Sequence, residues 1–491
     1  MKRYHHNLSN SRNYTGNFGN LIPLQRPVDM LPGDTLSHVT SALIRMSPLV
    51  APVMHPVHAK IHHFRVDFRL IWEEFDNFIT GGPSGTFTAV PPYVVAPAVT
   101  GWVAGSLADY LGMPINQPNI QVSALPFRAY WFVRNTMYRN QQLMSEVAYS
   151  VASGLDVTTP TTTCAMAPWM DDYFTASKPE PQLGPETYLP LGTSAPVTEN
   201  GDLRVSTGAS GPRNIVMGAL GGNDLTYSGG VAVGNSVYAS GLEVDLTAAS
   251  SASVSDLALA MAVQRMKIAR NKGARIQDML KQWGVQPSDR SLDLPLYLGG
   301  GTETIQFSEV LQTGPDSADE GVGNLYGHGI GAMRSNAYTH FFDNFSYCLS
   351  LGVVNPITVY HQGIHKSLIR QTKEDFWNPE LEATGMQAIT NKEVVGNHVT
   401  PDGIFGFIDK YNEYREINNS VAGEFHPGEL LEDYTLARDL PTNVALNSAF
   451  VTSNPSNRIF ASTTTHQLRI MARHNMSCYR KVSKYAPTLS V

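Results

Sequence analysis

The chain has 491 residues, of which 42% are hydrophobic and 16% charged, and its formal net charge is -7. Typical soluble domains are about 25% charged, so the low share predicts a surface depleted in charge, like the core of a subunit interface. No apolar run approaches the ~20 residues of a membrane helix and no secretory leader is evident. Three distant cysteines, Cys164, Cys348 and Cys478, argue against a disulfide framework and a zinc site.

Positive charge is concentrated at the two ends of the chain. Residues 1–28 contain Lys2, Arg3, Arg12 and Arg26 without an acid, and residues 440–491 contain six basic residues without an acid. The remaining segment has 25 basic and 42 acidic residues, a net charge of -17. Basic ends on an acidic body predict two environments, with an anion on the side where the ends lie. Residues 1–28 are also polar and without a hydrophobic period, which predicts a mobile arm that cannot fold alone.

The first regular elements are a strand and a short helix. Residues 62–70 alternate between apolar and polar side chains, which predicts a strand with Phe64, Val66, Phe68 and Leu70 on one face. Residues 72–79 place apolar side chains on one helical stripe. Residues 126–141 begin with a proline, which favours the first turn of a second helix.

The middle of the chain predicts an insertion followed by the longest helix. Residues 193–250 are rich in Gly, Ser, Thr, Asn and Ala, which indicates a long insertion loop or small hairpins. A helix is predicted over about 255–283, interrupted at Gly273, with a stripe of Ile276, Met279, Leu280 and Trp283.

Two further strands are predicted toward the end of the chain. Residues 342–354 alternate, and residues 468–473 place Arg469 and Arg473 on the same non-core face. Distant strands separated by long mixed insertions favour an all-β fold with helical insertions, a jelly-roll β-sandwich with an eight-stranded core. Eight strands of about six residues use only about 48 positions, so one domain elaborated by long loops is expected.

No catalytic arrangement is evident. Glu73 and Glu74 are consecutive on a predicted helix, so their carboxylates diverge by about 100°. "GHGIGA" (327–332) lacks the glycine register and the following helix of a phosphate loop. The histidines between 55 and 63 cannot converge on one metal, because His58 and His62 would lie about 13 Å apart along a strand. We expect neither an enzyme nor a bound metal or cofactor.

Several stretches in order resemble one known family. They are residues 31–82, "SLADYLGMP" (106–114), "LPLGTSAPV" (189–197), "FWNPELEATGMQAITNKEVVG" (376–396) and "FGFIDKYNEYR" (405–415). With similar matches between them, they span most of residues 18–480 and resemble the major capsid proteins of microviruses. The Gly/Ser-rich insertion is most similar to the gokushovirus branch.

The resemblance implies a viral jelly roll that forms an icosahedral capsid of about 60 copies around circular single-stranded DNA of a bacteriophage. It also implies an internal scaffolding protein during assembly in the host bacterial cytoplasm, a DNA pilot protein, and a host surface receptor. The expected organisation is a basic internal arm (1–28) and a single jelly-roll capsid domain (29–491). Residues 193–250 would form a surface protrusion.

The expected DNA-binding residues combine the basic ends with aromatic rings on which bases can stack. They are Lys2, Arg3, Tyr4, Arg12, Tyr14, Phe18, Arg469, Arg473, Arg480, Lys481 and Lys484. An arm that only wraps a neighbouring subunit is the alternative. The expected host-contact residues are Asn223, Asp224, Tyr227, Asn235 and Tyr238.

A charge count limits DNA binding by this chain. About 60 copies of ten positive charges give about 600, fewer than the roughly 1,470 phosphates needed to encode the chain. Another cation, such as a small basic DNA-packaging protein, is therefore expected to share the interior. The competing reading of the whole sequence is a cellular β-sandwich that binds or cleaves carbohydrate. It would need a cleft of convergent acids, which the sequence does not show.

Overall fold

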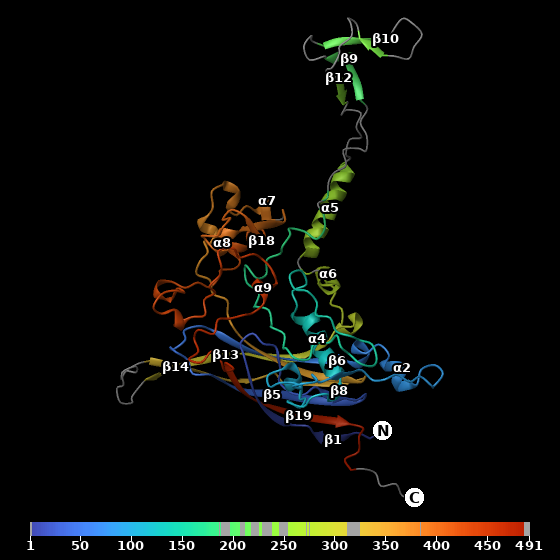
Figure 1. Ribbon diagram of the computed structural model, residues 1–491, viewed down its shortest axis with the longest axis vertical. Helices are drawn as coiled ribbons and strands as arrows, with labels where there is room; N and C mark the ends of the chain where they lie inside the picture. Colours follow the sequence, from blue (N-terminus) through green and yellow to red (C-terminus); the bar gives the residue numbers. More distant parts are fainter. Residues whose placement is uncertain are drawn as a thin grey trace. The chain divides into compact units, whose positions relative to one another are not determined.

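The computed structural model describes residues 2–185, 187, 197–206, 212–217, 225–227, 238–244, 254–271, 273, 275–311, 325–382 and 384–485 (Figure 1). The chain divides into two compact units. The larger comprises Met1–Pro181 with Asn271–Val491, and the smaller comprises Gln182–Arg270.

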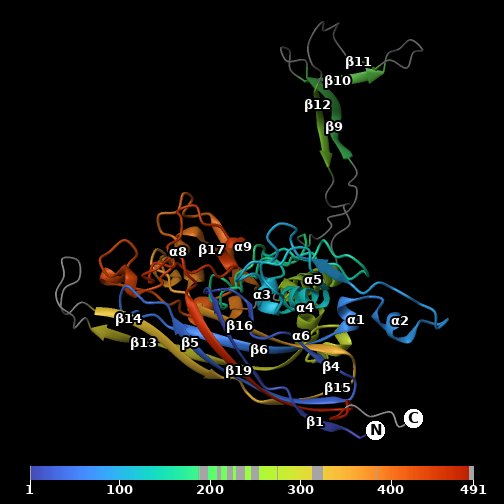
Figure 2. The same cartoon turned by 60° about the horizontal axis from the view of Figure 1, so that its bottom comes forward.

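The larger unit is built on a curled antiparallel sheet of 11 strands (Figure 2). Its main path runs in the order β1 (Tyr4–Asn7), β19 (Leu468–Arg480), β5 (Asp34–Met46), β14 (Leu325–Arg334), β13 (Leu296–Leu311), β6 (Val57–Asp67), β16 (Ser346–Pro356) and β3 (Ile22–Pro23). Three more strands join it: β2 (Asn10–Gly16) pairs with β19, β15 (Tyr338–Phe342) with β5, and β4 (Val28–Met30) with β16.

Strand β13 folds this sheet into two layers. Its first part, up to Ile305, pairs with β6, and its second part, from Gln306, pairs with β14. The change of partner places β6 and β16 opposite β5 and β19, with a shared apolar core that includes Ile44, Ile61 and Ile470. The expected all-β jelly-roll sandwich is therefore confirmed.

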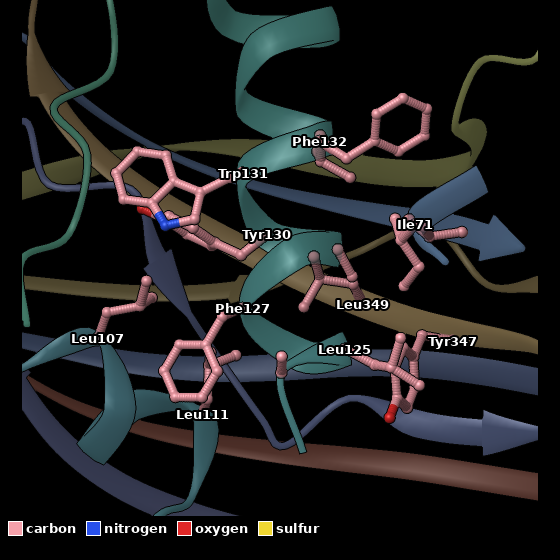
Figure 3. Packing of buried hydrophobic residues seen from close by; sticks show 14 of the residues in the cluster. Ile71, Leu107, Leu111, Leu125, Phe127, Tyr130, Trp131, Phe132, Tyr347 and Leu349 are labelled. Carbon is pink, nitrogen blue, oxygen red and sulfur yellow. The ribbon is translucent and has the colours of Figure 1, made fainter. Parts of the chain in front are cut away.

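Strand β16 is buried on both faces, and every residue from Ser346 to Pro356 is buried. Its inner face looks into the sandwich, and its other face packs under helix α4 (Leu125–Val133). Figure 3 shows Phe127 and Tyr130 of this helix near Leu349 of β16. Helix α4 has its proline in the first turn, as predicted, and continues into a π-helical turn at Arg134–Tyr138.

The predicted strand over 62–70 is wrong beyond Asp67. Residues Phe68–Ile71 form the short helix α1, and α2 follows at Phe75–Thr80. The turn buries Ile71 and Trp72 in the core beneath α4, which continued alternation could not do. Ile79, placed on the buried stripe from the sequence, is 50% exposed.

The remaining described elements of the larger unit are short. The helices are α3 (Leu107–Leu111), α6 (Ile276–Gln282), α7 (Pro379–Glu382), α8 (Asn391–Val394) and α9 (Ser448–Val451). The 3-10 turns are Asp289–Leu292, Lys366–Leu368, Lys373–Asp375, Asn412–Tyr414, Gly423–Phe425 and Glu432–Tyr434. Two small sheets pair β7 (Tyr93–Val95) with β8 (Gln121–Ser123), and β17 (Met386–Thr390) with β18 (Ile404–Asp409).

Residues 4–30 form an N-terminal clasp that reaches both edges of the main sheet. Strands β1 and β2 lie along the whole of β19, whereas β3 and β4 lie along β16. Between them Phe18, Leu21 and Leu24 are buried. The prediction of a mobile arm separate from the domain is therefore wrong for these residues, because their backbone forms strand pairs with β19 and β16.

The smaller unit contains a four-stranded antiparallel sheet in the order β11-β10-β9-β12. Its strands are β9 (Val197–Ser206), β10 (Pro212–Met217), β11 (Leu225–Tyr227) and β12 (Tyr238–Val244). The sequence predicted either a long loop or small hairpins for this insertion, and its described residues form hairpins. Helix α5 (Val254–Asn271) follows, and the predicted long helix is broken between α5 and α6, around Gly273.

Candidate nucleic-acid interface

The outward face of β19, β5 and β14 carries four exposed arginines: Arg45, Arg334, Arg469 and Arg473. We call this surface the arginine face. The side chains between them along each strand point inward, since Ile44, Met333 and Ile470 belong to the core of the sandwich. The predicted placement of Arg469 and Arg473 on a non-core face is confirmed by the alternating burial along β19.

Strand register brings the four arginines together. Arg469 lies directly opposite Arg45, whereas Arg473 and Arg334 flank Ser41 from either side. Neighbouring strands are about 4.8 Å apart and positions four residues apart on one strand are about 13 Å apart. The arginines therefore form two rows at a spacing that a phosphate backbone can follow.

No carboxylate balances these charges on the face itself. Across β19, β5 and β14, Asp34 is the only Asp or Glu, and it is buried in a 2.7 Å ion pair with Arg480. Like charges directly opposite one another destabilise a sheet. The pair Arg469 and Arg45 is thus a place where a bound anion would relieve repulsion.

A cavity of about 620 Å³ opens beside the row formed by Arg45 and Arg469. Its lining combines the cations Arg12, Arg45 and Arg469 with the apolar surfaces of Leu43 and Met471. The acid in the lining, Asp109, has its carboxylate on the backbone N–H of Gly105 at 2.8 Å. Positive groups beside an apolar wall suit a nucleotide, whose phosphate is charged and whose base is flat.

The predicted residues at the chain ends divide into exposed and committed groups. Lys2, Lys481 and Lys484 are exposed, and the Lys2 ammonium lies 5.7 Å from the centre of the Tyr4 ring. Arg3 is exposed and donates to the Thr35 hydroxyl at 2.8 Å. These side chains remain available to an anion.

Three predicted contacts are corrected by the structure. Phe18 is 2% exposed and packs on Phe460, so its ring cannot stack on a base. Tyr14 packs on the core of the sandwich, and burial raises the pKa of its hydroxyl. Arg12 donates to the backbone carbonyls of Tyr110 and Asp109, and burial lowers its pKa.

Arg480 is also committed within the chain. It pairs with the buried Asp34 and donates to the carbonyl of Asp29 at 3.0 Å. We therefore remove Arg480 from the candidate DNA contacts. Arg45 and Arg334 were missed because each is the single arginine of its strand. The sequence did contain a signal for them. Each is the last exposed residue of its strand, and the exposed face of that strand has no Asp or Glu.

The expected host-contact residues lie in the smaller unit. Asn223, Asp224 and Asn235 fall outside the described residues, whereas Tyr227 ends β11 and Tyr238 begins β12. In strand register, Tyr227 lies opposite Ile215 and Tyr238 lies opposite Ser206.

The histidines between 55 and 63 bind separate neighbours. His55 contacts the Ile357 carbonyl, His58 the Thr304 hydroxyl, His62 Tyr138, and His63 Ser350. Among the described residues, no group of three His, Cys, Asp or Glu side chains could hold a metal ion. Within the same residues, no helix is long and apolar enough to cross a membrane.

Comparison with known proteins identifies the family. Residues 1–489 match the family model described as "Capsid protein (F protein)". The chain is 32% identical to capsid protein VP1 of Bdellovibrio phage phiMH2K over 87% of this chain and 83% of that protein. It is 29% identical to capsid protein VP1 of Spiroplasma virus 4, over 96% of this chain and 92% of that protein.

A third relative is capsid protein VP1 of Chlamydia phage 1, at 25% identity over 93% of this chain and 91% of that protein. The family model spans the sandwich, the clasp and the insertion alike. They leave the alternative of a carbohydrate-binding or carbohydrate-cleaving protein without support. The chain belongs to the capsid protein (F protein) family of microviruses, and it is a structural component of the virion.

Proposed function

We propose that this protein forms a closed icosahedral shell of about 60 copies around single-stranded DNA, with the arginine face directed toward the genome. The observation that carries the proposal is the acid-free sheet face with Arg45, Arg334, Arg469 and Arg473. The exposed Lys2, Arg3, Lys481 and Lys484, with the half-buried Tyr4, would extend the same contact surface.

Exposed apolar side chains support assembly from many copies. Val99, Leu430, Val157, Ile417 and Leu368 are each at least 77% exposed in the single chain. Burial of such side chains against neighbouring copies would remove apolar surface from water and so favour association. Sedimentation of purified shells should show a particle of about 60 chains, and a stable monomer as the sole native form would contradict the proposal.

The DNA contact is tested by the salt dependence of binding. Each phosphate contact to a single strand adds about -0.7 to the slope of log affinity against log salt concentration. Replacing the four arginines of the arginine face by glutamine should flatten that slope by up to about 3. The measurement is fluorescence anisotropy of a labelled single-stranded oligonucleotide at several salt concentrations.

A matched control replaces two cations on other parts of the larger unit, Lys373→Gln and Arg415→Gln. Both are exposed, at 92% and 43% of their side chains, and each already lies beside a glutamate. The control should leave the slope unchanged. An unchanged slope in the arginine-face variant would mean that DNA meets another surface.

Further partners belong to the same proposal. An internal scaffolding protein would act during assembly in the bacterial cytoplasm, and a DNA pilot protein would accompany the genome. A host receptor would meet the smaller unit, near Tyr227 and Tyr238. A small basic packaging protein would supply the positive charge that the chain lacks, and mass spectrometry of purified particles would detect it.

A further inference from the structure

Three histidines meet in the interior of the sandwich, whereas the arginine face lies on its surface. They are His38 of β5, His474 of β19 and His63 of β6, and each is at most 2% exposed. The rings of His38 and His63 have centroids 4.6 Å apart, although their strands belong to opposite layers. We call these residues the histidine cluster.

The cluster is held by neutral hydrogen-bonding groups from every element around it. The Nε2 of His38 lies 3.3 Å from Nδ1 of His474, and the Thr40 hydroxyl contacts both nitrogens. The Nδ1 of His38 meets the Tyr338 hydroxyl at 2.9 Å. None of the hydrogen bonds described for the three rings involves a carboxylate.

The same hydrogen bonds join the two layers and the clasp. His63 contacts Ser350 of β16 at 2.8 Å and Ser335 at 3.2 Å, and Ser335 accepts from the backbone of Thr40. His474 contacts the carbonyl of Leu24 at 3.4 Å, and Gln25 donates to Ser350 at 3.2 Å. The cluster thus links β5, β19, β6 and β16 to one another and to the clasp at Leu24 and Gln25.

A neutral imidazole has one N–H donor and one acceptor nitrogen, whereas a protonated imidazole has two donors. If His38 and His474 both gained a proton, two N–H groups would face each other across 3.3 Å. The new positive charges would also be buried, and none of the described hydrogen bonds of these rings would supply an anion. Burial of an unpaired charge is strongly unfavourable.

The charged groups on the surrounding elements do not offset the cost of burying positive charge on these rings. Arg65 and Asp67 follow His63 on β6, and Arg65 also binds Asp343 beyond β15, so both carboxylates are already paired. His340 on β15 lies 3.3 Å from Arg65. Asp34 on β5 is paired with Arg480, and Arg12 on β2 adds a further positive charge near His474.

We propose that the histidine cluster is an acid-sensitive fastening that loosens the sandwich and its N-terminal clasp when the pH falls. Burial lowers the pKa of His38 to about 3 and that of His474 to about 4, and it holds the pKa of His63 well below its usual value. Since the unfolded chain binds these protons near pH 6.5, acidification below that pH favours unfolding. Stability is then lost progressively down to the folded values.

The experiment measures the unfolding equilibrium of the full chain in urea between pH 7 and pH 4.5. Each buried imidazole should shift that equilibrium up to about ten-fold per pH unit. His63→Gln keeps a donor and an acceptor without titrating, so the pH dependence should fall by about that factor. His328→Gln, at an exposed position, is the matched control and should leave it unchanged.

A second measurement covers the case in which His63→Gln does not fold. Hydrogen–deuterium exchange at the ring C2 position, followed by mass spectrometry, reports the protonation of each histidine in the unmodified chain. The three rings should stay neutral at pH 5 while the protein remains folded. Rings that become protonated near pH 6.5 without loss of structure, or equal pH dependence with and without His63, would overturn the proposal. Both tests use the full chain before assembly, so their outcome is independent of shell formation.

Discussion

The interior of this capsid protein contains charged side chains that are paired in a specific geometry. Arg128 of α4 and Asp156 are both fully buried and lie 2.8 Å apart. Arg128 also donates to the carbonyls of Ile71 and Ala152. Burial raises the pKa of Asp156, but hydrogen bonds from Thr159 and Arg128 outweigh it and hold that pKa below its usual value. Arg128 therefore joins α4 to the end of α1 and to the segment that contains Ala152 and Asp156.

Removing one partner of this pair should be costly. Arg128→Met keeps much of the side-chain volume but leaves the Asp156 carboxylate buried without its cation. We expect the free energy of unfolding to fall by about 3–5 kcal/mol, measured by urea denaturation. Arg69→Met breaks an exposed pair with Asp293 and is the control, with an expected loss of at most about 1 kcal/mol. Equal losses in both variants would show that burial of Asp156 is not the cause.

Among the strands, the clasp shows what sequence patterns miss. Strand β19 was predictable because Leu468, Ile470 and Ala472 alternate with exposed residues. Strands β1 and β2 were not, since their side chains are polar and their stability comes from backbone pairing with β19, more than 450 residues away. Local composition contains no information about a partner so distant in the chain. The same reason explains why Arg45 and Arg334 entered the candidate site only when the register was known.

Deleting residues 2–16 should expose the edge of β19 along its whole length. An uncovered edge strand pairs with other chains, so we expect aggregation in place of a folded product. The triple variant Lys2→Ser, Arg3→Ser, Arg12→Ser is the control, because it keeps the backbone that pairs with β19. Light scattering after expression distinguishes the two. A soluble, folded deletion variant would show that the clasp is dispensable.

In the complete chain, two units are joined at positions that lie close together. The side chain of Asn271 donates to the carbonyl of Glu180 at 2.6 Å, so the larger unit meets itself on either side of residues 182–270. Domain insertions are commonly tolerated where the two ends that they join lie close together in the host fold. The position of the insertion was readable from its composition, whereas its wider bounds depend on contacts that α5 makes within its own unit, such as that between Lys267 and Pro185.

The smaller unit should therefore be removable. Replacing residues 182–270 with a short Gly-Ser linker should leave the unfolding temperature of the larger unit within a few degrees and should still allow shells to form. If the smaller unit meets the host, attachment of such particles to cells should fall at least ten-fold in a binding assay. The double variant Tyr227→Ala, Tyr238→Ala in the full chain, measured in the same binding assay, shows whether two of the predicted contact residues account for that loss. A large fall in the yield of shells, with unchanged attachment of the shells that do form, would place the smaller unit in assembly instead of host contact.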